Sequence, residues 1–352
     1  MIKEWNLLRV IACLSIVFLH STTYTGWTKG SFNLEYYDYF RLLLCFATPT
    51  FIILSIIILA NRYKSELPSN FFMKRFKFVM LPFISFAIID ALMVNLLSEN
   101  GIDIISKVLF NLKGGYGGYF ILIIFQFYIL HYLVLKYKIS IEKLFPVTVL
   151  IMIVQLYLLY STDIAIFVNN EDIIRHLFIA WLAYYAVGFL IGKNYDKLHI
   201  LLKKYKWYTL VGLFFALFLM FLSFEAGNKL VFSRRIDIFV LSTAVTMVIL
   251  AWGQYVPNFK IINMISNYSL GIYLVHWQVQ RVLAPYLGDY FESMTAMIIG
   301  MFFISLILSM VIIKLISLLP FGKYIVGNTN RKHRKVANPR IKTFKKLQNS
   351  SL

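Results

Sequence analysis

Ten apolar runs, most of them long enough to cross a lipid bilayer, follow one another along this chain of 352 residues. A helix needs roughly 20 apolar residues to cross the hydrocarbon core, and lipid offers no hydrogen-bond partner to backbone outside a helix. Only 14% of the residues are charged, against about a quarter in soluble domains. The sequence therefore predicts an all-α polytopic membrane protein with about ten transmembrane helices. The runs cover residues 6–24, 39–60, 78–97, 117–136, 145–161, 174–192, 208–224, 236–252, 268–287 and 293–318.

Lysine and arginine residues are distributed unequally between the two sides that these runs define. One side, which includes both termini, holds 24 of them, whereas the other side holds seven. Cytoplasmic loops carry the excess of basic residues, so we expect both termini to be cytoplasmic. We expect residues 1–320 to form the membrane domain and residues 321–352 a basic tail over anionic membrane lipids. The formal net charge of +19 does not predict nucleic-acid binding, because the basic residues lie in short patches between the runs.

The first run contains the stretch "RVIACLSIVFLH", which begins with Arg9 and ends with His20. Eleven residues of helix turn by about 20° more than three full turns and rise roughly 16 Å, so both side chains point the same way at two depths. Arg9 would lie near the cytoplasmic boundary and His20 toward the outer half. Two simpler interpretations stay open: Arg9 could reach lipid headgroups, and His20 could mark the outer interface.

Other polar residues inside the runs favour a functional site. His276, in "NYSLGIYLVHWQVQR", is predicted near mid-membrane, where ionisable residues are costly and usually face a cavity or a partner. The two cysteines lie in apolar runs, which predicts buried thiols and neither a disulfide framework nor a metal site. The ionisable residues predicted within the membrane are Arg9, His20, Arg41, Asp90, His276 and Arg281.

Four motifs, in the expected order, resemble those of the membrane-bound acyltransferase-3 family. "RVIACLSIVFLH" resembles its R-x10-H signature, and "TPTFIILSIIIL" resembles its second helix. "FFMKRFKFVMLPF" resembles its basic approach to the third helix, and "YSLGIYLVH" its late histidine motif. The resemblance covers residues 1 to about 320. Ile56 departs from it, because many members have glycine there, and this argues against close backbone packing at that point.

The resemblance implies an enzyme that moves an acyl group from cytoplasmic acyl-CoA to an extracellular glycopolymer. Arg9 and Arg75 would then bind the phosphates of the donor. His20, together with His276 and Arg9, would form the catalytic group. A neutral imidazole suits a general base on the acceptor hydroxyl, or a transient acyl carrier. Acyl-CoA would be a substrate, with no bound cofactor and no metal.

Two stretches on the side with few cations, "TGWTKGSFNLEYYDYF" and "GNKLVFSRRID", are candidates for acceptor binding. The first places aromatic rings beside Glu35 and Asp38, a combination that can hold sugars, although an interfacial aromatic belt is the alternative. Arg234 and Arg235 break the positive-inside pattern there. An anionic acceptor, or a carboxylate-bearing acyl group such as succinyl, would explain them.

The resulting hypothesis is a transmembrane O-acyltransferase of the bacterial plasma membrane that transfers acetyl or succinyl groups to a cell-surface polysaccharide. "ATPTFIILS" and "GGYGGYFILIIFQFYILHYLV" resemble a narrower group, that of the staphylococcal intercellular-adhesion polysaccharide. They support the alternative of a poly-N-acetylglucosamine exporter in biofilm formation. A third alternative is a structural partner in a polysaccharide synthase complex. Polar residues gather on the first, second and ninth runs, which suits a local site better than a continuous pore.

Overall fold

The computed structural model describes all residues except 1, 31–33, 161–162, 165, 167–168 and 330–352, and the described part is helical and without strands. From residue 330 onward, the predicted basic tail lies outside the described residues. Each of the ten predicted runs falls mainly on helices. The helices that carry the runs are α1 (Lys3–Lys29), α2 (Tyr37–Leu44), α3 (Ala47–Arg62), α5 (Leu81–Leu97), α7 (Phe120–Lys136), α8 (Ile141–Tyr160), α11 (Leu182–Lys193), α13 (Lys206–Glu225), α14 (Ile236–Trp252), α15 (Lys260–Tyr290) and α16 (Met294–Leu318).

Shorter elements complete the chain. A π-helical turn at Phe76–Met80 joins α4 (Phe71–Arg75) to α5, and a 3₁₀ turn at Phe178–Trp181 leads into α11. The remaining short helices are α6 (Ile104–Leu112), α10 (Glu171–Ile174), α12 (Tyr195–Lys204) and α17 (Gly322–Ile325).

Six helical segments in the described part of the chain are long and apolar enough to cross a membrane. The apolar helices at Phe120–Lys136, Phe178–Lys193 and Ile236–Trp252 are shorter. These lengths and compositions support a multi-pass membrane protein, while the total of about ten crossings and the cytoplasmic termini stay predictions. The six segments are Lys3–Lys29, Tyr37–Arg62, Phe71–Leu97, Ile141–Tyr160, Lys206–Glu225 and Met294–Leu318.

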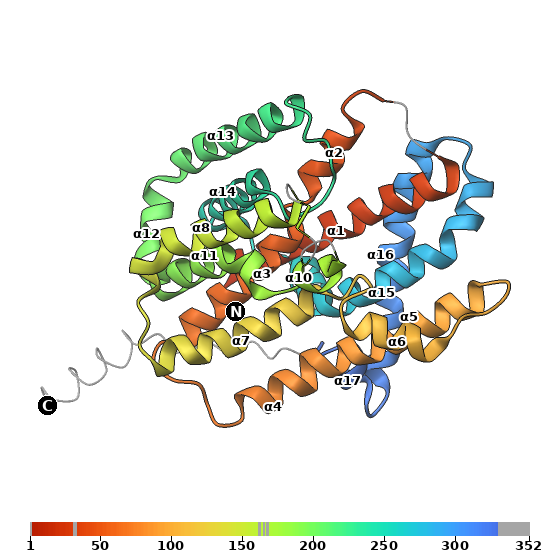
Figure 1. The fold of residues 1–352 in the computed structure, drawn as a ribbon, viewed down its shortest axis with the longest axis horizontal. Coiled ribbons are helices and arrows are strands. Elements are labelled where there is room, and N and C mark those ends of the chain that lie inside the picture. The colour runs from red at the N-terminus through yellow and green to blue at the C-terminus, as the bar shows by residue number, and fades with distance from the viewer. Residues whose placement is uncertain (1, 31–33, 161–162, 165, 167–168, 330–352) are drawn as a thin grey trace, which may run out of the picture.

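The outer surface of several helices is apolar, as lipid contact requires. On α13, the rings of Phe214, Phe215 and Phe218 are exposed, and on α16 Phe303 and Ile307 are exposed. Soluble proteins rarely expose large contiguous apolar patches. These faces are therefore the natural contact with the hydrocarbon core, and α13 lies at the upper edge of the molecule in Figure 1.

Helices α1 and α15 pack against each other in the middle of the molecule (Figure 1), and they run parallel. Arg9 contacts Ser266 near the start of both helices, and Lys29 reaches the Glu292 carbonyl just beyond the end of α15. Between these points, Gln280 donates to the Val17 carbonyl. Residue numbers therefore increase in the same direction along both helices. Arg9 lies at one end of this α1–α15 interface, which we call the seam, and His20 lies closer to its other end.

A second close contact joins α3 to α11 through glycines of α11. A Cβ atom at Gly192 would lie 2.5 Å from the Ile57 carbonyl oxygen, and one at Gly188 would lie 2.8 Å from Ile56 Cβ. Small residues let membrane helices approach closely. Ile56 is fully buried in this contact, so the sequence-based argument against close packing there is wrong. The small residue lies on the partner helix instead.

Helix α6 begins with a side-chain cap. Asp103 Oδ1 accepts hydrogen bonds from the backbone N–H groups of Ile105 (3.0 Å) and Ser106 (3.3 Å), and the Ser106 hydroxyl donates to Oδ2 (2.6 Å). These hydrogen bonds to the charged form hold the pKa of Asp103 below its ordinary value. The cap fixes the start of α6, whose inner face contacts α5 through Asn111.

Candidate active site

His20 and His276 face each other across the seam of α1 and α15. Their ring centroids are 5.3 Å apart and the rings are tilted by 31°. His276 Nδ1 lies 2.7 Å from the Ile272 carbonyl oxygen. Because a carbonyl can only accept, Nδ1 carries a proton, and the neutral ring then keeps a lone pair on Nε2. His276 Nε2 and His20 Nδ1 are buried and have no hydrogen-bond partner among the described residues.

An aromatic wall leads from this histidine pair toward the surface. The Trp277 ring lies edge-on to His20, with centroids 4.7 Å apart, and also contacts Tyr24 and Trp27. Trp27 is 66% exposed, so the wall begins in the interior and ends at the surface. Aromatic faces are suitable for apolar contact with sugar rings, and here they adjoin the histidine pair, whose two buried nitrogens lack hydrogen-bond partners among the described residues.

Arg9 lies at the other end of the seam and is 7% exposed. Its Nη1 donates to Ser266 Oγ at 2.8 Å and to Asn6 Oδ1 at 3.4 Å, and Ser266 also donates to Asn6. Arg9 and His20 thus both contact α15, as expected from their spacing of eleven residues. Burial among polar side chains of two helices does not fit an arginine that extends to lipid headgroups.

Arg75 lies in a different environment from Arg9. Its guanidinium lies over the rings of Phe71 and Tyr128, 5.0 Å from each centroid. Such cation–π contacts hold the guanidinium between α4 and α7. Arg75 is half-buried, and its predicted role in donor binding stays a prediction.

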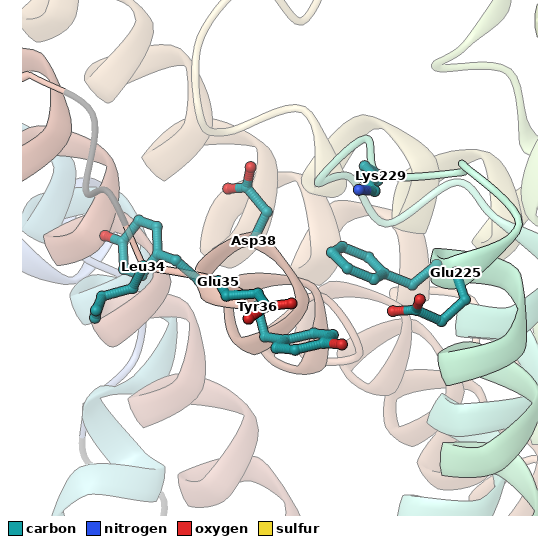
Figure 2. Close-up of a pocket in the computed structure, with 8 residues that line it drawn as sticks. Leu34, Glu35, Tyr36, Asp38, Glu225 and Lys229 are labelled. Atoms are coloured by element: carbon teal, nitrogen blue, oxygen red, sulfur yellow. The ribbon is translucent and has the colours of Figure 1, made fainter.

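Two hollows lie next to each other where the acceptor is expected, and both include Tyr37 and Asp38. The first, of about 290 Å³, is also lined by Glu35, Glu225 and Lys229 (Figure 2). The second, of about 330 Å³, is also lined by Thr22, Thr23, Gly26, Trp27 and Arg41. Because Trp27 contacts Trp277, the second hollow adjoins the aromatic wall of the histidine pair.

Arg41 forms the inner side of the second hollow. Its guanidinium donates to Thr22 (3.2 Å), Thr23 (3.3 Å) and Asp38 (3.2 Å). These bonds tie α2 to α1 close to His20. They also place one cation and one carboxylate at the edge of an aromatic hollow.

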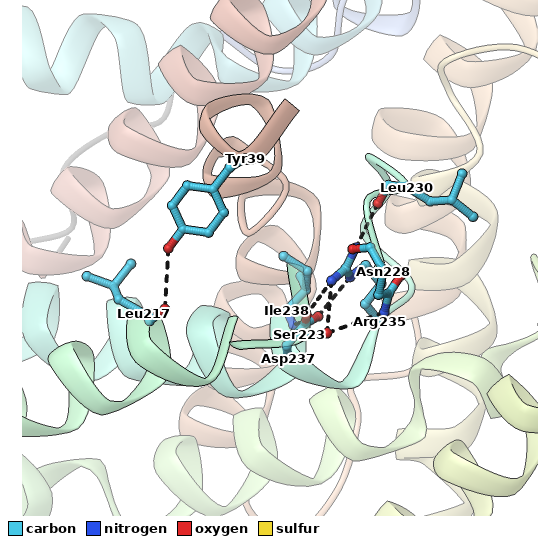
Figure 3. Close-up of polar contacts among 8 residues, drawn as sticks. All are labelled: Tyr39, Leu217, Ser223, Asn228, Leu230, Arg235, Asp237 and Ile238. Carbon is cyan, nitrogen blue, oxygen red and sulfur yellow. Dashed lines mark hydrogen bonds and ion pairs between the residues drawn. The ribbon is translucent and has the colours of Figure 1, made fainter. Parts of the chain in front are cut away.

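Arg235 is buried in the segment between α13 and α14, and all five of its N–H groups are used. Two donate to Asp237 and one to Ser223, while Nη1 donates to the carbonyls of Asn228 and Leu230 (Figure 3). A guanidinium has five N–H donors, so this one holds the segment and has none left for an acceptor. Arg234 is less buried and donates to the Tyr160 hydroxyl.

Comparison with known proteins identifies the family. A family model described as an acyltransferase domain, Acyl_transf_3, matches residues 2–314. The chain belongs to the acyltransferase-3 family. It is 31% identical over 293 residues to "Putative membrane-bound acyltransferase YfiQ" of Bacillus subtilis, an alignment that covers 78% of this chain and 80% of the relative. No solved structure matches it.

Further relatives are staphylococcal. The chain is 27% identical over 290 residues to the "Probable poly-beta-1,6-N-acetyl-D-glucosamine export protein" of Staphylococcus aureus, covering 76% of this chain and 79% of the relative. It is 25% identical over 288 residues to the protein of that name in Staphylococcus epidermidis, covering 76% and 78%. Family and relatives together support a multi-pass membrane acyltransferase.

In this acyltransferase-3 chain, the sequence motifs indicated His20 and His276 but not the residues that hold their two helices together. Gln280 is fully buried and donates to the Val17 carbonyl (3.0 Å) and Ser21 Oγ (2.9 Å), which joins α15 to α1 beside His20. The sequence does contain an indication of this contact in "WQVQR", because two glutamines within an apolar run need hydrogen-bond partners. Among the described residues, no group of three or more His, Cys, Asp or Glu side chains could hold a metal ion.

Proposed function

We propose that this protein transfers an acetyl or succinyl group from cytoplasmic acyl-CoA to a hydroxyl of a cell-surface polysaccharide. His20 or its neighbour His276 removes the hydroxyl proton as the oxygen attacks the thioester carbonyl. The carbon–sulfur bond breaks, and the proton passes to the departing CoA thiolate. The products are an ester on the sugar and free CoA.

The observation that carries this proposal is the histidine pair, in which two buried ring nitrogens have no hydrogen-bond partner among the described residues. A buried polar group without a partner costs about 1–3 kcal/mol, so it calls for an explanation. A substrate hydroxyl would supply the missing hydrogen bond. The aromatic wall of Trp277, Tyr24 and Trp27 supports an approach of the sugar from the exposed end.

Arg9 supports a donor that approaches from the other end of the seam. Its planar guanidinium can form two hydrogen bonds to one phosphate. The pantetheine arm of acyl-CoA would then lie along α1 and α15, with the thioester near His20. Glu35, Asp38 and Arg234 would contact the acceptor at the opposite end, and Arg235 would hold the segment that carries Arg234.

Reconstituted vesicles test the proposal directly. The full chain is placed in liposomes that enclose acyl-CoA, and β-1,6-linked N-acetylglucosamine oligosaccharide is added outside. We expect ester formation on the oligosaccharide in vesicles whose Lys203 side faces the lumen, as determined by cysteine labelling. Free CoA without acylated sugar would contradict the proposal.

Export of a polysaccharide is the second candidate, and the name of the staphylococcal relatives favours it. The same vesicles separate the two functions. An exporter moves unmodified labelled oligosaccharide across the membrane without acyl-CoA. The transferase esterifies the sugar and needs the donor.

A further inference from the structure

A charged cluster forms around Asp90 and includes Gln278 and Arg281, which follow His276 on α15, and the proposed reaction does not use it. Asp90 of α5 is fully buried. Its Oδ1 accepts from Gln278 (2.7 Å) and lies 3.0 Å from Arg281 Nη1, and its Oδ2 accepts from Asn111 (2.9 Å). Lys107 Nζ lies 3.9 Å from the same oxygen. One carboxylate thus faces two cations.

The position of Arg281 connects this cluster with the aromatic wall. Trp277 and Arg281 are four residues apart on α15, so they project from the same face, one turn from each other. The Tyr24 ring contacts Trp277, and the buried Tyr24 hydroxyl has no hydrogen-bond partner among the described residues. Arg281 therefore extends the wall that begins at His20, toward the predicted outer face.

Arg281 is held in place by Asp90 and Gln278 but still has N–H donors without an acceptor among them. Its contacts with Asp90 and Gln278 both involve Nη1, which leaves Nε and Nη2 with three of the five N–H groups for a ligand. Its side chain is 21% exposed. Arg281 and Lys107 together face a single carboxylate, so the cluster carries one positive charge in excess.

We infer that Arg281, positioned by Asp90 and Gln278, binds a carboxylate of the substrate that reacts at the His20–His276 pair. This inference rests on the proposed function and adds a substrate class to it. A planar guanidinium binds a carboxylate through two parallel hydrogen bonds. The carboxylate belongs either to a dicarboxylic acyl group or to the acceptor sugar. Both sources share this chemistry.

A two-by-two transfer experiment distinguishes the two sources. Vesicles containing the full chain receive acetyl-CoA or succinyl-CoA, and either a neutral N-acetylglucosamine oligosaccharide or one oxidised to carry a carboxylate. We expect faster transfer by the wild type in one carboxylate-bearing arm. Arg281→Gln should lower the ratio of that arm to the neutral arm about tenfold or more, the usual value of a charge-assisted hydrogen bond.

Lys107→Gln is the matched control, because it removes the other cation of the cluster from α6. It should leave the ratio unchanged. In each variant the remaining cation still balances Asp90, so both should fold. Arg281→Lys keeps the charge but not the paired donors and should give an intermediate ratio. The inference would be overturned if Arg281→Gln lowered the transfer rate equally in the neutral and carboxylate-bearing arms. It would also be overturned if Lys107→Gln lowered the ratio of the two arms as much as Arg281→Gln does.

A binding measurement separates failure of this inference from failure of the proposed function. Succinate should raise the thermal unfolding temperature of the purified protein, and neutral succinamide should not. The increase should disappear in Arg281→Gln and persist in Lys107→Gln. Stabilisation without any transfer would refute the acyltransferase reaction while supporting the anion site. An increase that persists in Arg281→Gln would refute the site.

Discussion

Arg235 is buried and His20 is half-buried, and the hydrogen bonding of their side chains differs completely. Every N–H of Arg235 has an acceptor, and its partners all come from residues 223–237. His20 contacts aromatic rings of α15, and its Nδ1 has no hydrogen-bond partner among the described residues. Satisfied polar groups stabilise a fold, whereas an open buried nitrogen costs stability. The difference distinguishes a residue that holds the protein together from one that is available to a substrate.

His131 extends the comparison to two histidines. It is fully buried on α7, with Nδ1 3.2 Å from the Tyr185 hydroxyl and Nε2 3.3 Å from the Tyr63 carbonyl oxygen. Both ring nitrogens are therefore occupied by protein. His131 resembles Arg235 in this respect, and it provides a control for His20 that has the same side chain but is more deeply buried.

The largest expected effect is on catalysis by His20→Ala. General acid–base catalysis contributes about 10²–10⁴-fold, so the rate of acyl transfer should fall by about that factor. Stability should fall only through the lost ring contacts with Trp277 and His276, because Nδ1 has no hydrogen-bond partner among the described residues to lose. The measurements are acylated oligosaccharide per folded protein and the thermal unfolding temperature.

The control for this prediction is His131→Ala. It should reduce stability by about 1–3 kcal/mol, since the Tyr185 hydroxyl loses its partner, and it should keep the transfer rate per folded molecule. Wild-type transfer by His20→Ala would remove His20 from the reaction.

Arg235→Ala should reduce stability strongly and the rate of acyl transfer only weakly, which is the reverse of the effect expected for His20→Ala. It leaves the buried Asp237 carboxylate without its cation, which costs about 3–5 kcal/mol. We expect a lower unfolding temperature. The rate of acyl transfer per folded protein should fall only if the segment between α13 and α14 becomes less ordered. Arg235→Lys should recover part of the stability. An unfolding temperature equal to that of the wild type would show that the hydrogen bonds of Arg235 contribute nothing net.

Arg9→Lys should have a smaller effect, of about tenfold, on the apparent affinity for acyl-CoA. A lysine keeps the charge but offers a phosphate no paired donors, and one lost charged hydrogen bond corresponds to about that factor. The dependence of the transfer rate on donor concentration measures it. Equal donor affinity in the two proteins would indicate that Arg9 is structural and acts through Ser266 and Asn6.

Arg234→Ala should have the smallest effect, a few-fold weaker use of the acceptor with donor affinity unchanged. Its hydrogen bond to Tyr160 is exposed, and an exposed contact of this kind is worth less than about 1 kcal/mol. The apparent affinity for the oligosaccharide is the measurement. If it does not change, acceptor binding does not involve this segment, and the hollows at Asp38 become the remaining place for it.

Much of this architecture could be predicted from local patterns. Apolar runs specify helices because lipid excludes other backbone structure, and the spacing of Arg9 and His20 gives a shared face because helix geometry is local. The histidine motif indicated His276, and the family motifs identified the reaction class. These are properties of single segments.

The partners of these segments could not be predicted in the same way. No local pattern shows that α1 lies parallel to α15, or that Gly188 of α11 makes room for Ile56. Arg235 was predicted to bind an acceptor because it breaks the charge pattern. Its complete set of five hydrogen bonds becomes visible only when Ser223, Asn228, Leu230 and Asp237 are brought together.

The parallel seam of α1 and α15 has a consequence for biosynthesis. Arg9 and its partner Ser266 are 257 residues apart, and ribosomes add roughly 5–20 residues per second. For on the order of 10 to 50 seconds, each newly made chain therefore has an arginine and a histidine in the membrane before the helix that accommodates them exists. Synthesis of α1 and α15 on two separate polypeptides should show whether α15 still packs against α1 when the two are not joined.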